Sequence, residues 1–387
     1  MGQGAQRAAD APQRLSPAQS RFLSDPSRVR IAVVGGGVTG LCTALALVRR
    51  GAAVILYDGG ATGESASAVA AGMLAPAFEA VLDPLSSGRF QLLRTARDLW
   101  PELMSSLGRP EALQRNGAMR VAFAEDGAQL DPLLRQLRSV GAEAERLDAL
   151  ATRKLSGARA DAQVSAVFTP EDWRLDPRQV LDLLTQAFVR EGGVLQRARV
   201  STGPDGRLSA AGAALSVDVA ILAAGADGAE LVAAAPEFAT LTPIKGQLLS
   251  FATLSAAGPI VRTTAGYLVP QNDRLICGAT MEEGVSNRMV QSARLDPFRT
   301  EAVRLYPELA KAPAQGFAAV RASTPDGLPL AGPSSRSGVY LATGMRRNGW
   351  LLAPLVAEVI AAHVAGEATG PYAALFRPDR FSKAGPA

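Results

Sequence analysis

The amino-terminal part of the chain arranges apolar and polar positions so as to predict a strand, a helix and a second strand in succession. Val29–Val34 is a short apolar run that leads into three glycines, and residues 38–50 then carry apolar side chains at helical spacing. Gly51 ends that helix, and the apolar run 53–57 closes on Asp58. The pattern predicts a βαβ unit.

Further patterns along the chain predict helices that alternate with short strands. Helical spacing marks 90–107, 128–140, 177–188 and 348–364. Strand patterns mark 119–123, 194–200, 219–223, 328–331 and 339–342. Between residues 241 and 280, several short strand patterns are separated by Pro and Gly, which is typical of an antiparallel sheet.

This alternation predicts an α/β protein with two domains, a number that suits 387 residues. The first is a Rossmann-type dinucleotide-binding domain assembled from separated segments, and the second is an α+β substrate domain with an antiparallel sheet. We place the cofactor domain at 29–100, 169–240 and 321–381, and the substrate domain at 101–168 and 241–320. Residues 1–28 have no apolar run and are expected to form a flexible extension.

Composition narrows the class of protein. Hydrophobic residues make up 48% and charged residues 20%, as in a globular protein. No apolar run reaches the roughly 18 residues of a membrane span, and the amino terminus lacks the apolar region of a secretory signal. Cys42 and Cys277 fall in apolar patterns and are expected to pack as small hydrophobic side chains, so a disulfide framework is not expected. The lack of a secretory signal and of paired cysteines predicts a cytoplasmic location.

The net charge of +4 is concentrated near the amino terminus. Residues 1–30 contain five arginines and two aspartates, which account for +3 of it. The remaining chain is therefore close to neutral. That distribution argues against a nucleic-acid partner, because such partners need a broad basic surface.

A glycine motif follows the first predicted strand. Gly35, Gly37 and Gly40 form G-x-G-x-x-G at the start of the helix, where glycines permit a tight turn, close approach of a pyrophosphate and close packing of helix on strand. Asp58 ends the second strand, where a carboxylate accepts hydrogen bonds from a ribose. These residues predict a dinucleotide site without separating FAD from NAD.

The chain has a single histidine, His363, which lies in an apolar helical pattern away from these motifs. Catalytic triads built on histidine are thereby excluded, and no metal site is predicted. The chemistry is therefore expected to depend on a cofactor.

Further motifs lie in the segments 63–76, 222–225, 243–246, 267–270, 278–281, 321–327 and 343–354. Together they resemble the D-amino-acid oxidase superfamily of FAD-dependent oxidoreductases, and within it most closely the glycine oxidases of thiamine biosynthesis. They occur in the family's order from about Val29 to the last helix.

The resemblance implies FAD as the cofactor. No cysteine occupies 343–350, so the flavin is expected to be bound non-covalently. The positions that carry over to cofactor binding are Gly35, Gly37, Val38, Gly40, Asp58, Ser67, Gly72, Met73, Val200, Gly225, Asn348, Gly349, Trp350 and Leu351.

The resemblance also implies a substrate pocket. Arg321 and Arg347 are expected to hold a substrate carboxylate, since a guanidinium grips it through two hydrogen bonds. Tyr267 is expected at the carboxylate end, unless it is only a half-buried strand aromatic, and Met281 forms an apolar wall. The alternative for one of the arginines in this segment is a surface ion pair, and that reading is favoured for Arg346 over Arg347. No residue is assigned as a general acid or base.

The activity implied is oxidative deamination of glycine and other small amino acids, with O2 reoxidising the flavin to give hydrogen peroxide. The resemblance further implies hand-off of the imine product to a thiazole synthase, and a homotetramer. Lys245 either assists the oxygen step or is an ordinary strand lysine. Two alternatives remain open: a D-amino-acid or D-proline dehydrogenase that uses a quinone, and, less favoured, a flavin oxidase domain that modifies tRNA.

Overall fold

The structure is a computed structural model that describes residues 17–60, 65–158, 164–252 and 258–382. Residues 1–16 of the expected extension, and Gly63 and Glu64 of the resemblance, lie outside the described residues. The predicted βαβ unit is confirmed: strand β1 (Arg30–Val34) is followed by helix α2 (Val38–Arg49) and strand β2 (Ala53–Tyr57). All four apolar positions of β1 after Arg30 are buried, as expected for a central strand.

Strand β1 lies inside a six-stranded sheet built from segments far apart in the sequence. The order is β19-β20-β12-β1-β2-β8, and all pairs are parallel except β19 with β20. The other strands are β8 (Val194–Gln196), β12 (Val219–Leu222), β19 (Leu330–Pro333) and β20 (Val339–Thr343). The predicted Rossmann-type fold assembled from separated segments is confirmed.

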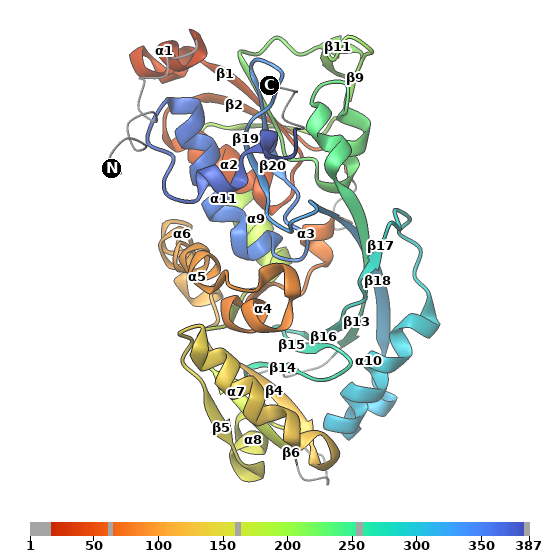
Figure 1. Cartoon of the computed structure of the whole chain (residues 1–387). Coiled ribbons are helices and arrows are strands. Elements are labelled where there is room, and N and C mark those ends of the chain that lie inside the picture. Colours follow the sequence, from red (N-terminus) through yellow and green to blue (C-terminus); the bar gives the residue numbers. More distant parts are fainter. Residues whose placement is uncertain (1–16, 61–64, 159–163, 253–257, 383–387) are drawn as a thin grey trace, which may run out of the picture.

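Two long helices pack against α2 beside this sheet. They are α9 (Pro177–Arg190) and α11 (Gly349–Ala365). Helix α11 is apolar on nearly all sides and almost every residue in it is buried. Figure 1 shows α2, α9 and α11 grouped in the same part of the molecule as the six-stranded sheet.

The predicted antiparallel sheet is present and larger than the 241–280 segment. Its main path is β17-β13-β16-β15-β14-β4-β6-β5, with β18 paired to β13 along its length, and only the β14 and β4 pair is parallel. The strands are β4 (Ala118–Phe123), β5 (Glu145–Leu147), β6 (Val164–Thr169), β13 (Thr242–Ala252), β14 (Ile260–Arg262), β15 (Tyr267–Pro270), β16 (Arg274–Gly278), β17 (Glu282–Glu283) and β18 (Ala314–Ser323). Strand β18 runs unbroken across the domain boundary placed at residue 321.

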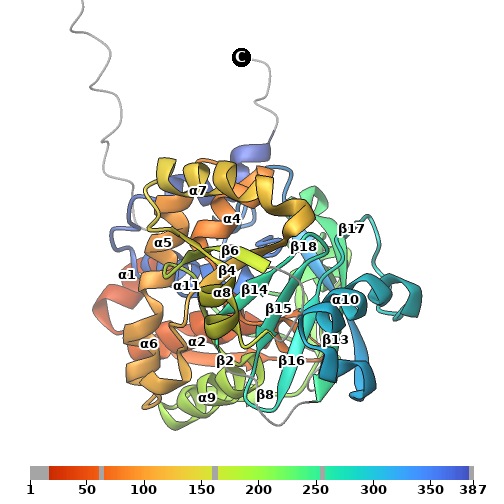
Figure 2. The same ribbon diagram turned by 90° about the horizontal axis from the view of Figure 1, so that it is seen from below.

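Helices cover both sides of this larger sheet. Helix α10 (Ser292–Leu305) packs on β13 and β16, and α7 (Leu130–Ser139) and α8 (Ala149–Ser156) pack on β6. Figure 2 shows α10 on the opposite side of the molecule from α5 (Phe90–Asp98) and α6 (Trp100–Ser106). Helix α4 (Pro76–Leu82) lies at mid-height in Figure 1, between the six-stranded sheet and the β4–β6 region.

The remaining elements are short. They comprise helices α1 (Pro17–Ser24), α3 (Ala66–Val69) and α12 (Ala373–Phe376), the two-stranded pair β3 (Met73–Leu74) and β7 (Trp173–Arg174), and the three-stranded sheet β9 (Val200–Thr202), β10 (Leu208–Ala210) and β11 (Ala213–Ala214). Within the described ranges, no helix is long and apolar enough to cross a membrane.

Three expectations from the sequence need correction. Residues 17–28 are not a flexible extension, because α1 forms there, buries Phe22 and packs on α11. The predicted helix 90–107 is two helices, α5 (Phe90–Asp98) and α6 (Trp100–Ser106), since Pro101 cannot donate the hydrogen bond that a continuous helix needs. The predicted strand 194–200 is likewise divided, as β8 pairs with β2 and β9 pairs with β10.

Candidate active site

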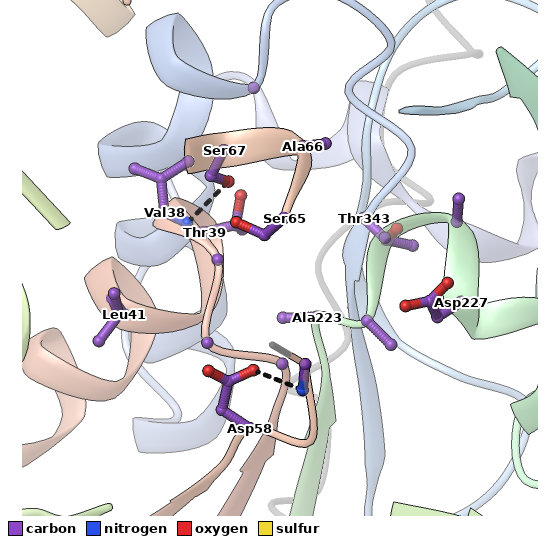
Figure 3. A pocket seen from close by; sticks show the side chains of 18 of the residues that line it. Val38, Thr39, Leu41, Asp58, Ser65, Ala66, Ser67, Ala223, Asp227 and Thr343 are labelled. Carbon is purple, nitrogen blue, oxygen red and sulfur yellow. Dashed lines mark hydrogen bonds between the residues drawn. The ribbon is translucent and has the colours of Figure 1, made fainter. Parts of the chain in front are cut away.

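The glycine motif forms the turn between β1 and α2 (Figure 3). Gly40 packs so closely that a Cβ atom there would lie 1.8 Å from the carbonyl oxygen of Gly35, so only glycine fits. Gly37 is the N-cap of α2 and offers no side chain to the first helical amides. The Val38 amide donates to the hydroxyl of Ser67 at 3.1 Å, which brings Ser67 against the start of the helix.

Asp58 follows β2 at the same edge of the sheet. Its carboxylate forms an ion pair with Arg197, a contact that the sequence did not predict. A Cβ atom on Gly36 would lie 2.6 Å from the carboxyl carbon of Asp58, so the turn and the acid are in direct contact. Figure 3 shows the Asp58 carboxylate beside the turn.

The two segments on which the flavin prediction rested are joined by a tryptophan. The indole nitrogen of Trp350 donates to the carbonyl oxygen of Ser67 at 3.0 Å. Trp100 in turn donates to the carbonyl of Trp350 at 3.1 Å. Asn348 is the residue before α11, so this helix begins where the sequence placed it. Residues near 67 and near 350 therefore form one wall, although they are far apart in the chain.

These elements enclose a first cavity of about 620 Å³. This volume is within the usual range for small-molecule and cofactor sites. The predicted cofactor residues that line it are Gly35, Gly37, Val38, Asp58, Ser67, Val200, Gly225, Gly349 and Trp350. A glycine turn that excludes side chains, a helix start and a carboxylate at the strand end together fit the pyrophosphate and ribose of FAD.

The other predicted cofactor residues lie elsewhere. Gly72, Met73 and Asn348 line a second cavity. Gly40 and Leu351 line neither cavity, since Gly40 packs against the turn and Leu351 is buried in the core. Their cofactor contacts stay predictions.

The second cavity has a volume of about 250 Å³, and all four residues predicted to bind the substrate line it: Tyr267, Met281, Arg321 and Arg347. Arg321, Arg347 and Trp350 line both cavities, which therefore adjoin. Tyr267 is buried, and burial raises the pKa of its hydroxyl, so it stays neutral at neutral pH.

Arg321 carries a charge without a carboxylate partner. Its guanidinium lies over Gly246, where a Cβ atom would approach it to 2.4 Å. Nη1 is 3.4 Å from the carbonyl oxygen of Thr280 and 3.4 Å from the sulfur of Met281, and both contacts are neutral. No ion pair to Arg321 occurs among the described residues. Burial lowers the pKa of Arg321. The ordinary pKa of a guanidinium is so high, however, that the group stays charged.

Arg347 instead has a partner that the sequence reading missed. Its Nε lies 2.9 Å from Oε2 of Glu79, and Nη2 of Arg262 lies 2.8 Å from the other oxygen, Oε1. The charge of Glu79 raises the pKa of Arg347. Glu79 and Arg262 both line the second cavity. The sequence did contain a signal for this partner, namely a glutamate inside the apolar helix Pro76–Leu82. A glutamate that is buried there must be paired with a positive charge.

The surroundings of Arg346 differ from the surface position that the sequence predicted for its ion pair. Arg346 forms an ion pair with Asp83 at 2.6 Å, as predicted, but their side chains are only 12% and 3% exposed. The pair is therefore buried and not at the surface. It forms where the chain enters α11, and it secures the segment that lines the first cavity.

Lys245 is fully buried in β13 and its ammonium donates to Oδ1 of Asn287 at 2.9 Å. It lines neither cavity. A role in the oxygen step stays a prediction. Cys42 and Cys277 are both free and buried, which confirms that they pack as small hydrophobic side chains.

Asp172 holds the start of helix α4, which carries Glu79. Its carboxylate oxygens accept hydrogen bonds from the amides of Ala77 at 2.8 Å and Phe78 at 3.3 Å. Burial nevertheless raises the pKa of Asp172 to about 7, although the charge of Arg262 opposes the shift. As the pH rises, Asp172 therefore keeps its proton up to about pH 7 in the folded state. In the unfolded chain the same carboxyl group has a pKa of about 3.9 and loses its proton at a much lower pH.

A pH dependence of stability follows from Asp172. The raised pKa of Asp172 makes a favourable contribution to the free energy of unfolding that is complete below pH ~4 and is lost as the pH rises through about 7. This contribution is at most about 4 kcal/mol. Urea unfolding at a series of pH values should show this loss in the parent protein and a flatter profile in Asp172→Asn. The exposed Asp205→Asn should keep the parent profile. Equal slopes for the parent and Asp172→Asn would contradict the assignment.

The fold and the two adjoining cavities are those of an FAD-dependent oxidoreductase of the amino-acid oxidase type. The sequence model of the DAO protein family, which is described as FAD dependent oxidoreductase, matches residues 30–363. The chain belongs to this family.

The chain is similar to several curated relatives. It is 28% identical to a glycine oxidase from Geobacillus kaustophilus, covering 86% of this chain and 92% of the relative. The crystal structure of glycine oxidase from that organism matches with a TM-score of 0.80 at 27% identity, over 91% of this chain and 99% of that one.

Two other relatives are longer than this chain. The bifunctional protein MnmC of tRNA 5-methylaminomethyl-2-thiouridine biosynthesis from Caulobacter sp. (strain K31) is 31% identical, over 96% of this chain and 61% of the relative. The bifunctional protein ThiO/ThiG from Trichormus variabilis is 30% identical, over 91% of this chain and 55% of the relative. The chain thus spans between half and two thirds of each.

Proposed function

We propose that this protein oxidises glycine and other small amino acids, with O2 as the electron acceptor. The observation that carries the proposal is Arg321, whose uncompensated charge lies in a small cavity next to the cofactor cavity. A carboxylate is the natural partner for such a guanidinium, because the pair is bidentate and charge-assisted. The similarity to glycine oxidases supports this substrate class.

The chain's own residues bind and orient the substrate. Arg321 holds the carboxylate, and Met281 provides an apolar wall that limits the size of the side chain. Tyr267 stays neutral and is available as a hydrogen-bond donor to the same carboxylate. Binding in this way fixes the α carbon beside the cofactor cavity, and such positioning supplies a large part of the rate enhancement.

FAD, when bound, supplies a two-electron acceptor for the hydrogen of the α carbon. The residues proposed to hold it are those of the first cavity, led by the glycine turn, Asp58 and the pair Gly349 and Trp350. The balanced reaction is glycine, O2 and water giving glyoxylate, ammonia and hydrogen peroxide. The imine formed before hydrolysis is the species proposed to pass to a thiazole synthase, which the ThiO/ThiG relative supports.

The test uses the purified chain loaded with FAD. Glycine, sarcosine, D-alanine and D-proline are added without oxygen, and the visible flavin band is recorded. We expect glycine and sarcosine to bleach the flavin, and air to restore it with one hydrogen peroxide per amine. Strict dependence on an added quinone would favour the dehydrogenase alternative, and no bleaching by any amine would overturn the proposal.

A second candidate is oxidation of an amine carried on a tRNA base. The 31% identity to the MnmC protein over nearly the whole chain favours it. Under this alternative, isolated tRNA lacking the final modification bleaches the flavin and free glycine does not. Bleaching by free glycine supports the amino-acid oxidase instead.

A further inference from the structure

Gly246 on β13 lies beneath the guanidinium of Arg321, which comes from the neighbouring strand β18. Arg321 is the register partner of Ile244, two residues before Gly246. Gly246 is therefore the diagonal neighbour of Arg321 on the same face of the sheet, within reach of a long side chain. Gly246 lines neither cavity, so it is expected to act on a substrate only through Arg321.

The side chain of Arg321 crosses β13 at this position. Its Nη1 atom lies 3.4 Å from the carbonyl oxygen of Thr280 and 3.4 Å from the sulfur of Met281. Both of these residues follow β16, which pairs with β13 along the edge opposite to β18. Neighbouring strands are about 4.8 Å apart, so an arginine on β18 reaches these groups only by lying across β13.

A side chain at position 246 would block this path. A Cβ atom there would lie 2.4 Å from both terminal nitrogens of Arg321 and 2.5 Å from its central carbon, whereas ordinary contact begins at 3.4 Å. The backbone of Gly246 is outside the left-handed region, so alanine fits the strand and its nearest obstacles are all atoms of Arg321. A methyl group at this position would therefore displace the guanidinium by about 1 Å, a misplacement large enough to slow a reaction strongly.

The carbonyl group of Thr280 is held on the same strand. The amide of Thr280 donates to the carbonyl of Gln247 at 3.1 Å, and the amide of Gln247 donates to the hydroxyl of Thr280 at 2.9 Å. That hydroxyl also donates to Oε1 of Glu282 at 2.6 Å. Because Gln247 directly follows Gly246, these hydrogen bonds fix the carbonyl of Thr280 relative to the backbone of Gly246. We call these two groups the Arg321 seat.

We propose that the Arg321 seat positions the substrate carboxylate, with Gly246 as the positioning residue that decides where the guanidinium lies. This inference rests on the proposed function, in which Arg321 binds that carboxylate. Both contacts of Arg321 use Nη1, so Nη2 and Nε have no acceptor among the residues that the structure describes and are left for a carboxylate. Through the carboxylate, the seat sets how the α carbon lies relative to the cofactor cavity.

The test measures glycine oxidation by the FAD-loaded full chain and its variants. Gly246→Ala is expected to lower kcat/KM by about 10–10²-fold, mainly through KM, while the visible spectrum shows that FAD stays bound. The matched control is Gly316→Ala on β18, where a Cβ atom would lie 2.6 Å from the side chain of Leu295, outside both cavities. It should keep the parent kcat/KM. An unchanged kcat/KM in Gly246→Ala, or an equal loss in Gly316→Ala, overturns the inference.

A double-mutant cycle separates positioning from damage to the sheet. If Gly246 acts through Arg321, adding Gly246→Ala to Arg321→Ala should change kcat/KM by less than about twofold, because the side chain that it displaces is already gone. A loss of the same size in both backgrounds overturns the inference, since the substitution would then act without Arg321.

Thr280 provides a second test that decides if Gly246→Ala does not retain FAD. Thr280→Val removes the hydroxyl that bonds to Gln247 and Glu282, so KM for glycine should rise by about 3–10-fold. Thr280→Ser keeps the hydroxyl and should have the parent KM, and a parent-like KM in Thr280→Val then overturns the inference. Glycine oxidation with an unchanged KM in every seat variant leaves the proposed function standing, whereas no bleaching of the flavin by any amine removes both.

Discussion

Replacing Arg321 with methionine is expected to lower kcat/KM for glycine by about 10²–10³-fold while FAD stays bound. The loss corresponds to about 3–4 kcal/mol, within the range for truncating one partner of a buried charged pair. The structure gives the reason: the contacts of Arg321 at 3.4 Å are to a carbonyl oxygen and a thioether, so its charge is free for a substrate. Steady-state kinetics of the purified variant measure the effect, and the visible spectrum reports the flavin.

Two further variants sharpen this result. Arg321→Lys keeps the charge but loses the bidentate geometry, so an intermediate kcat/KM is expected. Arg207→Met changes an exposed arginine that lines neither cavity and should match the parent protein. Loss of FAD from Arg321→Met, with no change in KM in the molecules that retain it, would assign Arg321 to the cofactor and not to the substrate.

Replacing Glu79 with glutamine is expected to lower the free energy of unfolding by about 3–5 kcal/mol, the cost of breaking a buried ion pair by removing one partner. Glu79 is only 5% exposed and contacts both Arg262 and Arg347. Glutamine preserves the shape but removes the carboxylate that forms an ion pair with both arginines. Equilibrium unfolding in urea, followed by circular dichroism, measures the change.

The matched control for Glu79 is an exposed glutamate. Glu125 pairs with Arg304 at the surface, where both side chains are substantially exposed. Glu125→Gln should cost less than about 1 kcal/mol, because solvent screens such pairs. If Glu79→Gln were no more destabilising than Glu125→Gln, the Arg262–Glu79–Arg347 cluster would not be a source of stability.

The two predictions concern one arrangement of charge. Glu79 neutralises part of the charge of Arg262 and Arg347, and it does not pair with Arg321. Arg321 thus remains available to an incoming carboxylate, while its neighbours stay in place. Among the arginines of this cavity, Arg321 therefore keeps a charge that Glu79 does not pair with.

The sequence alone predicted the local parts of the cofactor site. The strand, turn, helix and strand from β1 to β2 follow from hydrophobic periodicity and from glycine positions, both of which act over a few residues. The break at Pro101 and the helix α1 were missed for two different reasons. A proline break inside an otherwise helical pattern is a boundary signal that was overlooked, whereas α1 is stabilised by burial of Phe22 against elements far along the chain.

The sequence by itself determined the βαβ unit, the class of fold and, through the family resemblance, FAD, and it predicted a substrate-binding role for the arginines at 321 and 347. Only the tertiary structure decided which arginines are free and which are paired. Glu79 and Arg262 come from a short helix and a strand whose register is set by sheet pairing, and no periodicity in one segment encodes that pairing. Charge compensation depends on distances of a few ångströms between such segments, so it becomes visible only when the chain is folded.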